Sequence, residues 1–587
     1  MIVFYGSDFS LNLTETKISF VEENPLFYNY FVRNYTWPFT KTLDAETSKV
    51  LKFLNLENST KYKTKFYGKL QIDNTFDQAY LIFTDHVGDS IEGTIYYGKA
   101  TFPLLDKKLS KLPFPVISTE SITSHAKEVI EKQYPEVGHN FPMVIDEKFK
   151  ETNKYDKFLG VINNYRGSFL ENYKKNEDGK IIAYNQNIMV PFPYLMEILR
   201  VGFASENMIM AGSFVSDKVN EKLLIYTDKY LEKFDSGLPD DFHFSTTNEV
   251  WKDDVVTANF ADVYRLSETG SYKVKLFLNI PSSIDVLDFI VELNEKELYK
   301  SNAQSINKSL TINIENSEDI GVIRFKLNLR KFTTNPNEAI GDIRKFNKFD
   351  FSFSDGQLNV FPKTFSLSEI MPDITFGAFL NKIKNWLNLE ITFENNVVNI
   401  NYIETKFLES PFKNETPFET TEPKRTFNQN KIYKLSTGND ELFISHEGVI
   451  STSDGYRDED IVKIPTGIRK LEVEALDSLF TVKKKESEDL GVFLYDGLKN
   501  DLPVAVDSVF ERAYTLNEVY NRYWLKWINF RLNSILIKDK FPVHVLEEFN
   551  INTGRFKYNQ KHIYKKIQKH RISETHWEVE IESETLT

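Results

Sequence analysis

The chain has 587 residues, of which 41% are apolar and 14% aromatic, with a formal net charge of −13 and no cysteine. Because single cores stop growing at roughly 250 to 300 residues, we expect several domains. The acidic balance argues against a dedicated nucleic-acid binder, whose affinity comes from cationic side chains. The lack of cysteine excludes disulfides, cysteine nucleophiles and cysteine-based zinc sites.

The first residues, MIVFYGSDFSLNL, carry no basic region and reach Asp8 too early for a secretory signal. The richest apolar run, residues 188–203, is interrupted by Pro191, Pro193, Glu197 and Arg200. It therefore falls short of the roughly 18 apolar residues that mark a membrane-spanning helix. We expect a soluble protein that is made in the cytoplasm and has no transmembrane segment.

Residues 1–112 are predicted to form a β-rich domain with one helix, over residues 44–56. Short turns separate the strands that follow, so these strands must be antiparallel neighbours. The three strands are expected over residues 64–72, 78–83 and 90–97. A small barrel or sandwich is the natural closure.

Residues 113–241 mix helix and loop, with the clearest helices over residues 124–133 and 194–203. A short segment, residues 207–214, follows the second helix. This order of proline, apolar helix and extended segment is similar to the order around Pro372. An internal duplication and a coincidence of pattern both remain open.

Residues 242–345 are predicted to form an inserted β-sandwich, because apolar and polar residues alternate in several runs. The clearest runs are residues 272–280, 310–314 and 325–329. Such a module serves either as a carbohydrate- or partner-binding domain or as a plain spacer.

Residues 346–409 contain a short amphipathic helix followed by a hairpin. Thr375 is the N-cap candidate, and the apolar residues recur at helical spacing at Phe376, Phe379, Leu380, Ile383 and Leu387. Residues 389–393 and 398–402 then alternate around a turn at Asn395 and Asn396. The segment is expected to be half buried on both the helix and the hairpin.

Residues 410–430 are polar, contain three prolines and show no periodicity, so they are predicted to be a linker or an extended arm. Residues 431–587 are predicted to form a carboxyl-terminal α+β domain. Its strands are expected near residues 471–475, 491–495 and 577–581. Thr515 and Glu518 form a capping box ahead of a helix that carries Trp524 and Trp527 as core residues, and a last helix is expected over residues 560–568.

The helix–hairpin with its Pro-Asp-Ile lead-in at residues 372–374, the β-rich first domain and the final block together resemble baseplate hub or tail-tip hub proteins of tailed phages, especially phages of the Bacteroidota type. The resemblance implies a mainly β fold with minor α, in which tail-tube-like β-barrel domains accompany the inserted β-sandwich. It also implies a virion tail protein, assembled in the host cytoplasm, that forms a ring, with a trimer favoured.

The resemblance further implies the partners of such a ring. These would be the tail tube or a distal tail protein, baseplate or fibre proteins and a tape-measure protein, with DNA passing transiently through the lumen and no stable nucleic acid. The acidic charge suits a lumen that does not hold DNA.

Motifs for chemistry are weak, and no catalytic, cofactor-binding or metal-binding residue is predicted. GTIYYGKA at residues 93–100 is close to a phosphate-binding loop, but Ala100 stands where Ser or Thr should bind magnesium. The nine histidines lack metal-site spacing, and the acidic stretch at residues 453–460 does not match an EF-hand loop. We expect no enzyme and no cofactor.

One basic run stands out between Lys557 and Arg571. It has two explanations: a solvated helix face, with cations near the helix carboxyl end, or a surface that docks onto an acidic neighbour, DNA or a tape-measure segment. The residues predicted as interface candidates are Lys561, Lys565, Lys566, Lys569 and Arg571.

The preferred hypothesis is therefore a structural hub protein of a phage tail. An alternative is an adhesin that binds glycan through residues 242–345. A third hypothesis is a hydrolase without a known motif.

Overall fold

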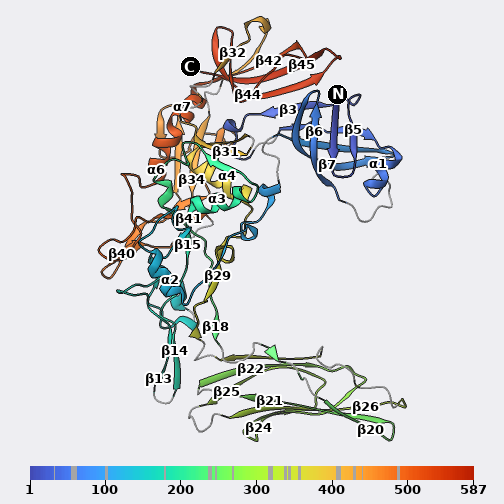
Figure 1. Ribbon diagram of the computed structural model, residues 1–587, viewed down its shortest axis with the longest axis vertical. Helices are drawn as coiled ribbons and strands as arrows, with labels where there is room; N and C mark the ends of the chain where they lie inside the picture. Colours follow the sequence, from blue (N-terminus) through green and yellow to red (C-terminus); the bar gives the residue numbers. More distant parts are fainter. Residues whose placement is uncertain are drawn as a thin grey trace.

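The computed structural model of the protein has both ends of the chain at one end of its longest axis and a β-sandwich at the other end (Figure 1). It describes residues 1–586 apart from 32–33, 54–62, 99–102, 152, 178–179, 236–240, 243, 245–246, 267–269, 315–320, 336–339, 341–345, 354–357, 395, 405–406, 408–410, 428–430, 439 and 485–488.

The protein is mainly β with few helices, which confirms the predicted fold class. The α-helices of the described residues are α1 (Ala45–Val50), α2 (Ile122–Val129), α3 (Leu195–Ala204), α4 (Phe376–Leu387), α6 (Leu516–Val519) and α7 (Leu525–Asn533). A π-helical turn, Tyr520–Trp524, joins α6 to α7. Among the described residues, no helix is both long enough and apolar enough to cross a membrane.

A sheet of 14 strands contains segments from both ends of the chain, in the order β2-β1-β6-β7-β8-β4-β3-β44-β45-β42-β33, with β5, β32 and β43 paired beside this path. The amino-terminal strands are β1 (Ile2–Gly6), β2 (Ser10–Asn12), β3 (Ser19–Glu23), β4 (Asn34–Thr36), β5 (Phe39–Thr42), β6 (Lys65–Ile72), β7 (Thr75–Val87) and β8 (Ser90–Tyr97). The others are β32 (Phe412–Asn414), β33 (Lys424–Phe427), β42 (Ile535–His544), β43 (Gly554–Lys557), β44 (Gln560–Arg571) and β45 (His576–Thr585).

The antiparallel neighbours predicted in residues 1–112 are present as β6, β7 and β8, and α1 forms within the predicted helix, whose residues 54–56 lie outside the described part. The prediction of a closed, tail-tube-like barrel in this domain is wrong. In the described part of the chain the sheet is open, because its path ends at β2 and β33 and these strands do not pair. The physical reason is that β3 pairs with β44, so an edge that could close an amino-terminal barrel is occupied by a distant strand.

The last predicted helix, over residues 560–568, is also wrong, because these residues belong to β44. Tyr564 and Ile567 have the spacing of a helix face, and both are buried in the core between the two halves of the sheet. A β-bulge between Tyr564 and Lys566 shifts the register, which lets both side chains face the same core in a strand.

The predicted linker is likewise corrected. Residues 412–427 contain β32, a 3₁₀ turn at Thr416–Phe418 and β33. β32 pairs with β43 in parallel and β33 pairs with β42. Although the segment is polar, it is fixed to the large sheet. Its strands pair with β43 and β42, and its Glu415 is fully buried.

The predicted β-sandwich is present. One sheet has the order β19-β27-β22-β25 and the other the order β20-β21-β26-β23-β24. Their facing side chains share one apolar core that includes Val274, Phe289 and Phe325. The strands are β19 (Asp241–Phe242), β20 (Thr247–Lys252), β21 (Val255–Arg265), β22 (Gly270–Asn279), β23 (Asp285–Leu293), β24 (Lys296–Ser301), β25 (Ser305–Ile314), β26 (Val322–Phe332) and β27 (Asn347–Phe353).

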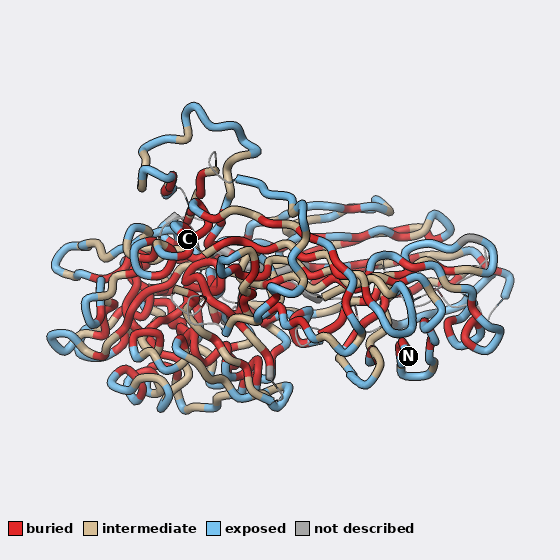
Figure 2. The backbone as a smooth tube through the Cα atoms, turned by 90° about the horizontal axis from the view of Figure 1, so that it is seen from above, coloured by how far each residue is buried: buried red, intermediate tan, exposed pale blue. Residues whose placement is uncertain are grey.

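The region between the large sheet and the sandwich is built largely of short strands in several small sheets. They are β9 (Val116–Ser118), β10 (His139–Asn140), β11 (Val144–Ile145), β12 (Val161–Ile162), β13 (Tyr173–Glu177), β14 (Lys180–Tyr184), β15 (Phe192–Pro193), β16 (Ile209–Ala211), β17 (Leu223–Tyr226), β18 (Phe234–Asp235), β28 (Leu358–Asn359), β29 (Thr364–Ser366), β30 (Leu389–Glu394), β31 (Val397–Tyr402), β34 (Ile432–Thr437), β35 (Asp440–Ser445), β36 (Gly448–Ile450), β37 (Ile461–Pro465), β38 (Ile468–Lys470), β39 (Val473–Leu476), β40 (Leu479–Val482) and β41 (Leu490–Leu494). Figure 2, seen along the longest axis, shows buried segments mainly in the interior of the molecule and exposed ones mainly at loops along its rim.

The predicted helix–hairpin is confirmed as α4, β30 and β31. The Thr375 hydroxyl accepts a hydrogen bond from the Ala378 amide at the start of α4, and Asn388 ends the helix in the left-handed region with φ 49°. Asn395 of the predicted turn lies outside the described residues.

The two predicted helix-plus-strand segments lie against each other in one core. The rings of Phe203 in α3 and Phe376 in α4 meet edge to face at 5.0 Å. Gly202 makes this contact close, because a Cβ atom there would lie 2.2 Å from the Phe376 ring. β16, which follows α3, pairs in parallel with β31, which follows α4.

Thr515 caps the last helices as predicted, because its hydroxyl accepts a hydrogen bond from the Glu518 amide, but the reciprocal bond of a capping box, from the Thr515 amide to the Glu518 carboxylate, is replaced by others. The carboxylate of Glu518 in turn accepts hydrogen bonds from the amides of Ala513 and Tyr514. Trp524 and Trp527 are both buried, as predicted.

Candidate interaction surface

The structure places Lys557 of the predicted basic run in β43 and the five interface candidates in β44, and three of those five pair with carboxylates of the same chain. The Lys569 Nζ lies 2.9 Å from Glu22 of β3, and the Lys566 Nζ lies 3.9 Å from Glu23. A guanidinium nitrogen of Arg571 lies 3.5 Å from Asp73. These pairs join β44 to the amino-terminal strands.

The other two candidates differ from these three. Lys565 is half-buried, and burial away from water lowers the pKa of its ammonium group. Lys561 is the most exposed of the five, and its Nζ lies 4.8 Å from the centre of the Phe412 ring. That any of the five contacts a partner stays a prediction.

A groove of about 1100 Å³ lies beside these pairs, between the amino-terminal and carboxyl-terminal strands of the large sheet. We call it the acidic groove. Phe20 is central to its floor, because its ring packs edge to face on Tyr97 at 5.9 Å and on Trp577 at 6.0 Å. Val543 and Val579 complete the apolar floor.

Charge distinguishes this groove. Among the described residues that line it, two are basic, Lys413 and Lys569, and five are acidic, namely Glu22, Asp73, Asp77, Glu547 and Glu548. Both lysines already have carboxylate partners, since Lys413 lies 2.5 Å from Glu547 and Lys569 pairs with Glu22. The lining therefore carries an excess of negative charge.

Tyr97, which also lines the groove, is nearly fully buried, and its hydroxyl makes no hydrogen bond with another described residue. Burial raises the pKa of this phenol well above its ordinary value, and the nearby carboxylates Glu22 and Asp77 add to the effect. A buried hydroxyl without a partner is uncommon in folded proteins.

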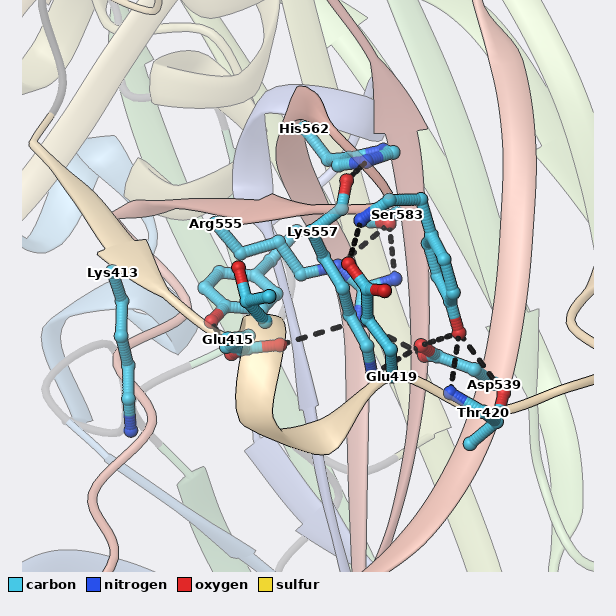
Figure 3. Close-up of polar contacts among 12 residues, drawn as sticks. Lys413, Glu415, Glu419, Thr420, Asp539, Arg555, Lys557, His562 and Ser583 are labelled. Atoms are coloured by element: carbon cyan, nitrogen blue, oxygen red, sulfur yellow. Dashed lines mark hydrogen bonds and ion pairs between the residues drawn. The ribbon is translucent and has the colours of Figure 1, made fainter.

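A buried network of charges fixes to the sheet the 412–420 segment, of which Phe412 and Lys413 line the groove (Figure 3). The Arg555 guanidinium lies 2.9 Å from Asp539 and 3.4 Å from Glu415, and Lys557 lies 2.6 Å from the other oxygen of Asp539. All four side chains are fully buried. Two cations thus balance two carboxylates away from water.

Polar neighbours complete this network. Arg555 also donates to the Ser583 hydroxyl at 2.7 Å, and the Tyr558 hydroxyl donates to Asp539 at 3.0 Å. The Tyr564 hydroxyl donates to Glu415. Sequence reasoning missed these residues, because an alternating polar residue in a strand gives no sign that its face is covered by another segment.

His562 lies in the same network and is fully buried. Its Nε2 lies 2.9 Å from the Lys557 carbonyl oxygen, so this nitrogen carries the hydrogen and donates it. Burial lowers the pKa of His562 to about 4, and the adjacent Arg555 adds to this effect. The imidazole is therefore neutral at physiological pH.

Other residues singled out by their sequence patterns do not come together with these. Residues 93–97 lie in β8, while Lys99 and Ala100 lie outside the described residues. Arg457 pairs with Glu459 and Asp460 within the acidic stretch. No group of three or more potential metal ligands occurs in the part of the chain that the structure describes.

His125 and His139 form a pair that the sequence spacing did not indicate. Their Nε2 atoms lie 3.0 Å apart and the rings are stacked. Burial lowers the pKa of His139 to about 3, and the proximity of His125 contributes. The pair is packed among apolar rings, including Phe141 and Phe365.

No protein-family model matches the chain, and no curated protein matches it. Among solved structures, the 43 kDa tail protein of prophage MuSo2 from Shewanella oneidensis is 9% identical over 62% of this chain and 98% of that chain, with a TM-score of 0.19. TmCBM61 in complex with β-1,4-galactotriose is 12% identical over 20% of this chain and 70% of that chain, with a TM-score of 0.11. At these TM-scores neither likeness carries an argument about fold or function.

Replacing Asp539 with Asn should destabilise the protein by about 3–5 kcal/mol, because Arg555 and Lys557 would then be buried with one carboxylate between them. Thermal unfolding, with hydrogen exchange of the β42 and β43 amides, measures the loss. The control is Glu578→Gln, which removes a surface pair with Lys540 and should cost less than about 1 kcal/mol. Equal effects of the two substitutions would contradict the role of the network.

The neutral state of His562 predicts a pH dependence of stability. Its pKa in the folded protein, about 4, lies below the ordinary 6.5. The unfolded chain therefore binds more protons, and stability falls as the pH falls from about 6.5 towards 4. His562→Gln keeps a donor and should remove up to about 3 kcal/mol of this loss.

Denaturant unfolding at pH 7 and pH 4.5 measures this effect. His446→Gln is the matched control, because it makes the same substitution at an exposed position outside the buried network. The same pH dependence in His562→Gln and in the unsubstituted protein would show that His562 is not the group responsible.

Proposed function

We propose that this protein is a structural hub protein of a phage tail or baseplate. In this function it forms a ring, with a trimer favoured, that continues the tail lumen and anchors tail-tip or fibre proteins in the virion, and it is not an enzyme. The sequence resemblance rests most heavily on residues 365–404, and one observation supports the proposal above others. This segment folds as the helix–hairpin that its apolar spacing predicts, and it lies in the main core.

The contacts of this segment connect distant parts of the chain. The Asn385 amide donates to the Asn29 carbonyl oxygen at 2.7 Å, and Asn388 donates to the Tyr523 carbonyl oxygen at 2.8 Å. Tyr402 stacks on Tyr523 with ring centres 4.9 Å apart. Residues near positions 29, 203 and 523 are thus held by one helix–hairpin, as expected of a protein that must keep a fixed frame under load.

The arrangement of the chain suits the same function. The large sheet and the sandwich lie at opposite ends of the longest axis (Figure 1). A ring built around one end would leave the sandwich on an outer arm, free to contact other proteins. An obligate ring of this kind needs interfaces on the order of 2,000 Å² or more.

The test is native mass determination with negative-stain electron microscopy of the purified chain, at about 1 to 50 μM, because assembly follows mass action. We expect a ring of defined subunit number around an open pore. A monomer at every concentration would contradict self-assembly. Addition of purified tail tube would then decide whether a template is needed.

Glycan binding through the sandwich is the second candidate function, and one surface favours it. Phe332 is 66% exposed on β26, and the guanidinium carbon of Arg330 lies 5.0 Å from its ring centre. Arg330 pairs with Asp285, and Asn328 donates to Asp288 on the same outer face. An exposed aromatic ring beside fixed polar groups is the chemistry that binds a sugar ring and its hydroxyls.

A glycan array probed with the full chain tests this candidate. If the surface binds glycan, Phe332→Ala should reduce binding at least about tenfold, because the stacking face is lost. Phe277→Ala is the matched control, since Phe277 is 46% exposed on the other sheet of the sandwich. The absence of any bound glycan, or equal losses in both variants, would argue against it.

A further inference from the structure

No function has been assigned above to the acidic groove. It combines an apolar floor, an excess of carboxylates and a buried hydroxyl without a hydrogen-bond partner. We propose that it receives strand β33 of a second copy of this chain, so that it forms the contact between neighbouring subunits. The inference rests on the proposed self-assembly and names the surfaces that produce it.

Strand β33 has the chemistry that the groove lacks. Its sequence is Lys-Arg-Thr-Phe, and all four residues are exposed. Lys424 and Arg425 form no ion pair with another described residue. The side chain of Phe427 is also available for contact, since it is 63% exposed. Two cations and an aromatic ring on one short strand complement a groove with acidic walls and an apolar floor.

The position of β33 explains why it can reach another subunit. It pairs along one edge with β42 and ends the path of the large sheet, so the part of the chain that the structure describes leaves its other edge unpaired. Such an edge offers backbone donors and acceptors to another chain. Its own sheet fixes the strand, so little ordering is required on binding.

The groove supplies matching groups near its mouth. Glu548 is exposed and Leu546 is 81% exposed, and both line the groove. We expect Arg425 to approach Glu548 and Phe427 to pack beside Leu546. A large exposed apolar residue on each surface would then be covered by the same contact.

The geometry of assembly follows from the two surfaces being different. A strand on one copy enters a groove on the next copy, whose own strand is still free. This is a heterologous contact, which closes into a ring when the rotation between subunits allows it and otherwise gives an open chain. The contact suits a ring when each copy gives its strand to one neighbour and receives a strand from another, whereas a reciprocal exchange between two copies would give a two-fold dimer.

Cysteine cross-linking tests the contact directly, because the chain contains no cysteine of its own. One preparation carries Phe427→Cys, and a second, affinity-tagged preparation carries Leu546→Cys. After mixing and mild oxidation we expect a disulfide-linked dimer of one chain of each kind, identified by peptide mass spectrometry. The matched control pairs Phe427→Cys with Phe510→Cys, which is 70% exposed but outside the groove.

Charge reversal provides a second measurement that does not depend on cross-linking. Arg425→Glu and Glu548→Lys should each weaken self-association about tenfold or more, because each places like charges together. The combination of both substitutions should restore association to within about threefold of the unsubstituted chain. Lys300→Glu, an exposed change on the sandwich, should leave association unchanged.

The outcomes separate this contact from the proposed function. A ring that persists without cross-linking above the control level would overturn the contact and leave the hub function standing. A chain that stays monomeric and does not cross-link would overturn both the contact and independent ring formation. Binding of β33 to a different protein would appear as charge-reversal effects on that complex without cross-links between copies, and would also overturn the proposal.

Discussion

The pairing of β3 with β44 is the interaction on which the rest of the architecture depends. Five residue pairs, from Ser19 with His570 to Glu23 with Lys566, join segments more than 500 positions apart in the sequence. This ladder turns two sets of antiparallel strands into one sheet. It also explains why the amino-terminal strands remain open, and it creates the groove between the two sets.

The buried charges fix the position of the 412–420 segment on the large sheet. Removing Arg555, Lys557, Asp539 and Glu415 from water is costly, and an apolar cluster of the same volume could give equal stability. Four charges that must all be matched, however, allow few alternative placements of the 412–420 segment. Because β33 follows this segment directly, the network also determines where the exposed edge strand lies on the sheet.

Local patterns in the sequence predicted the elements whose partners lie nearby. Thr375 and the spacing from Phe376 to Leu387 predict α4 correctly, since the cap and the apolar face are properties of that segment alone. The alternation in residues 272–280 likewise predicts a strand of a sandwich. The same reasoning failed at residues 560–568, because Tyr564 and Ile567 have helical spacing and only the bulge at Lys565 makes them compatible with a strand.

The candidate surface could be predicted only in part for a related reason. The cations of β44 were visible as a cluster, but their partners Glu22, Glu23 and Asp73 lie at the other end of the sequence. A charge pattern shows which groups need partners and does not show where those partners are. The sequence of residues 410–430 predicts a linker or an extended arm and gives no sign of burial, because residues 412–427 are covered only through their contacts with β42, β43 and the buried network.

The distance in sequence between β3 and β44 also bears on when the acidic groove can form. Contacts between remote segments form slowly, because loop-closure entropy must be lost before they are made. Phe20 and Tyr97 are synthesised early, whereas Trp577 and Val579 are synthesised more than 450 residues later. The groove is therefore complete only after both sets of strands exist and have paired. An assembly contact built there would be withheld from partly synthesised chains, which limits premature association of incomplete subunits.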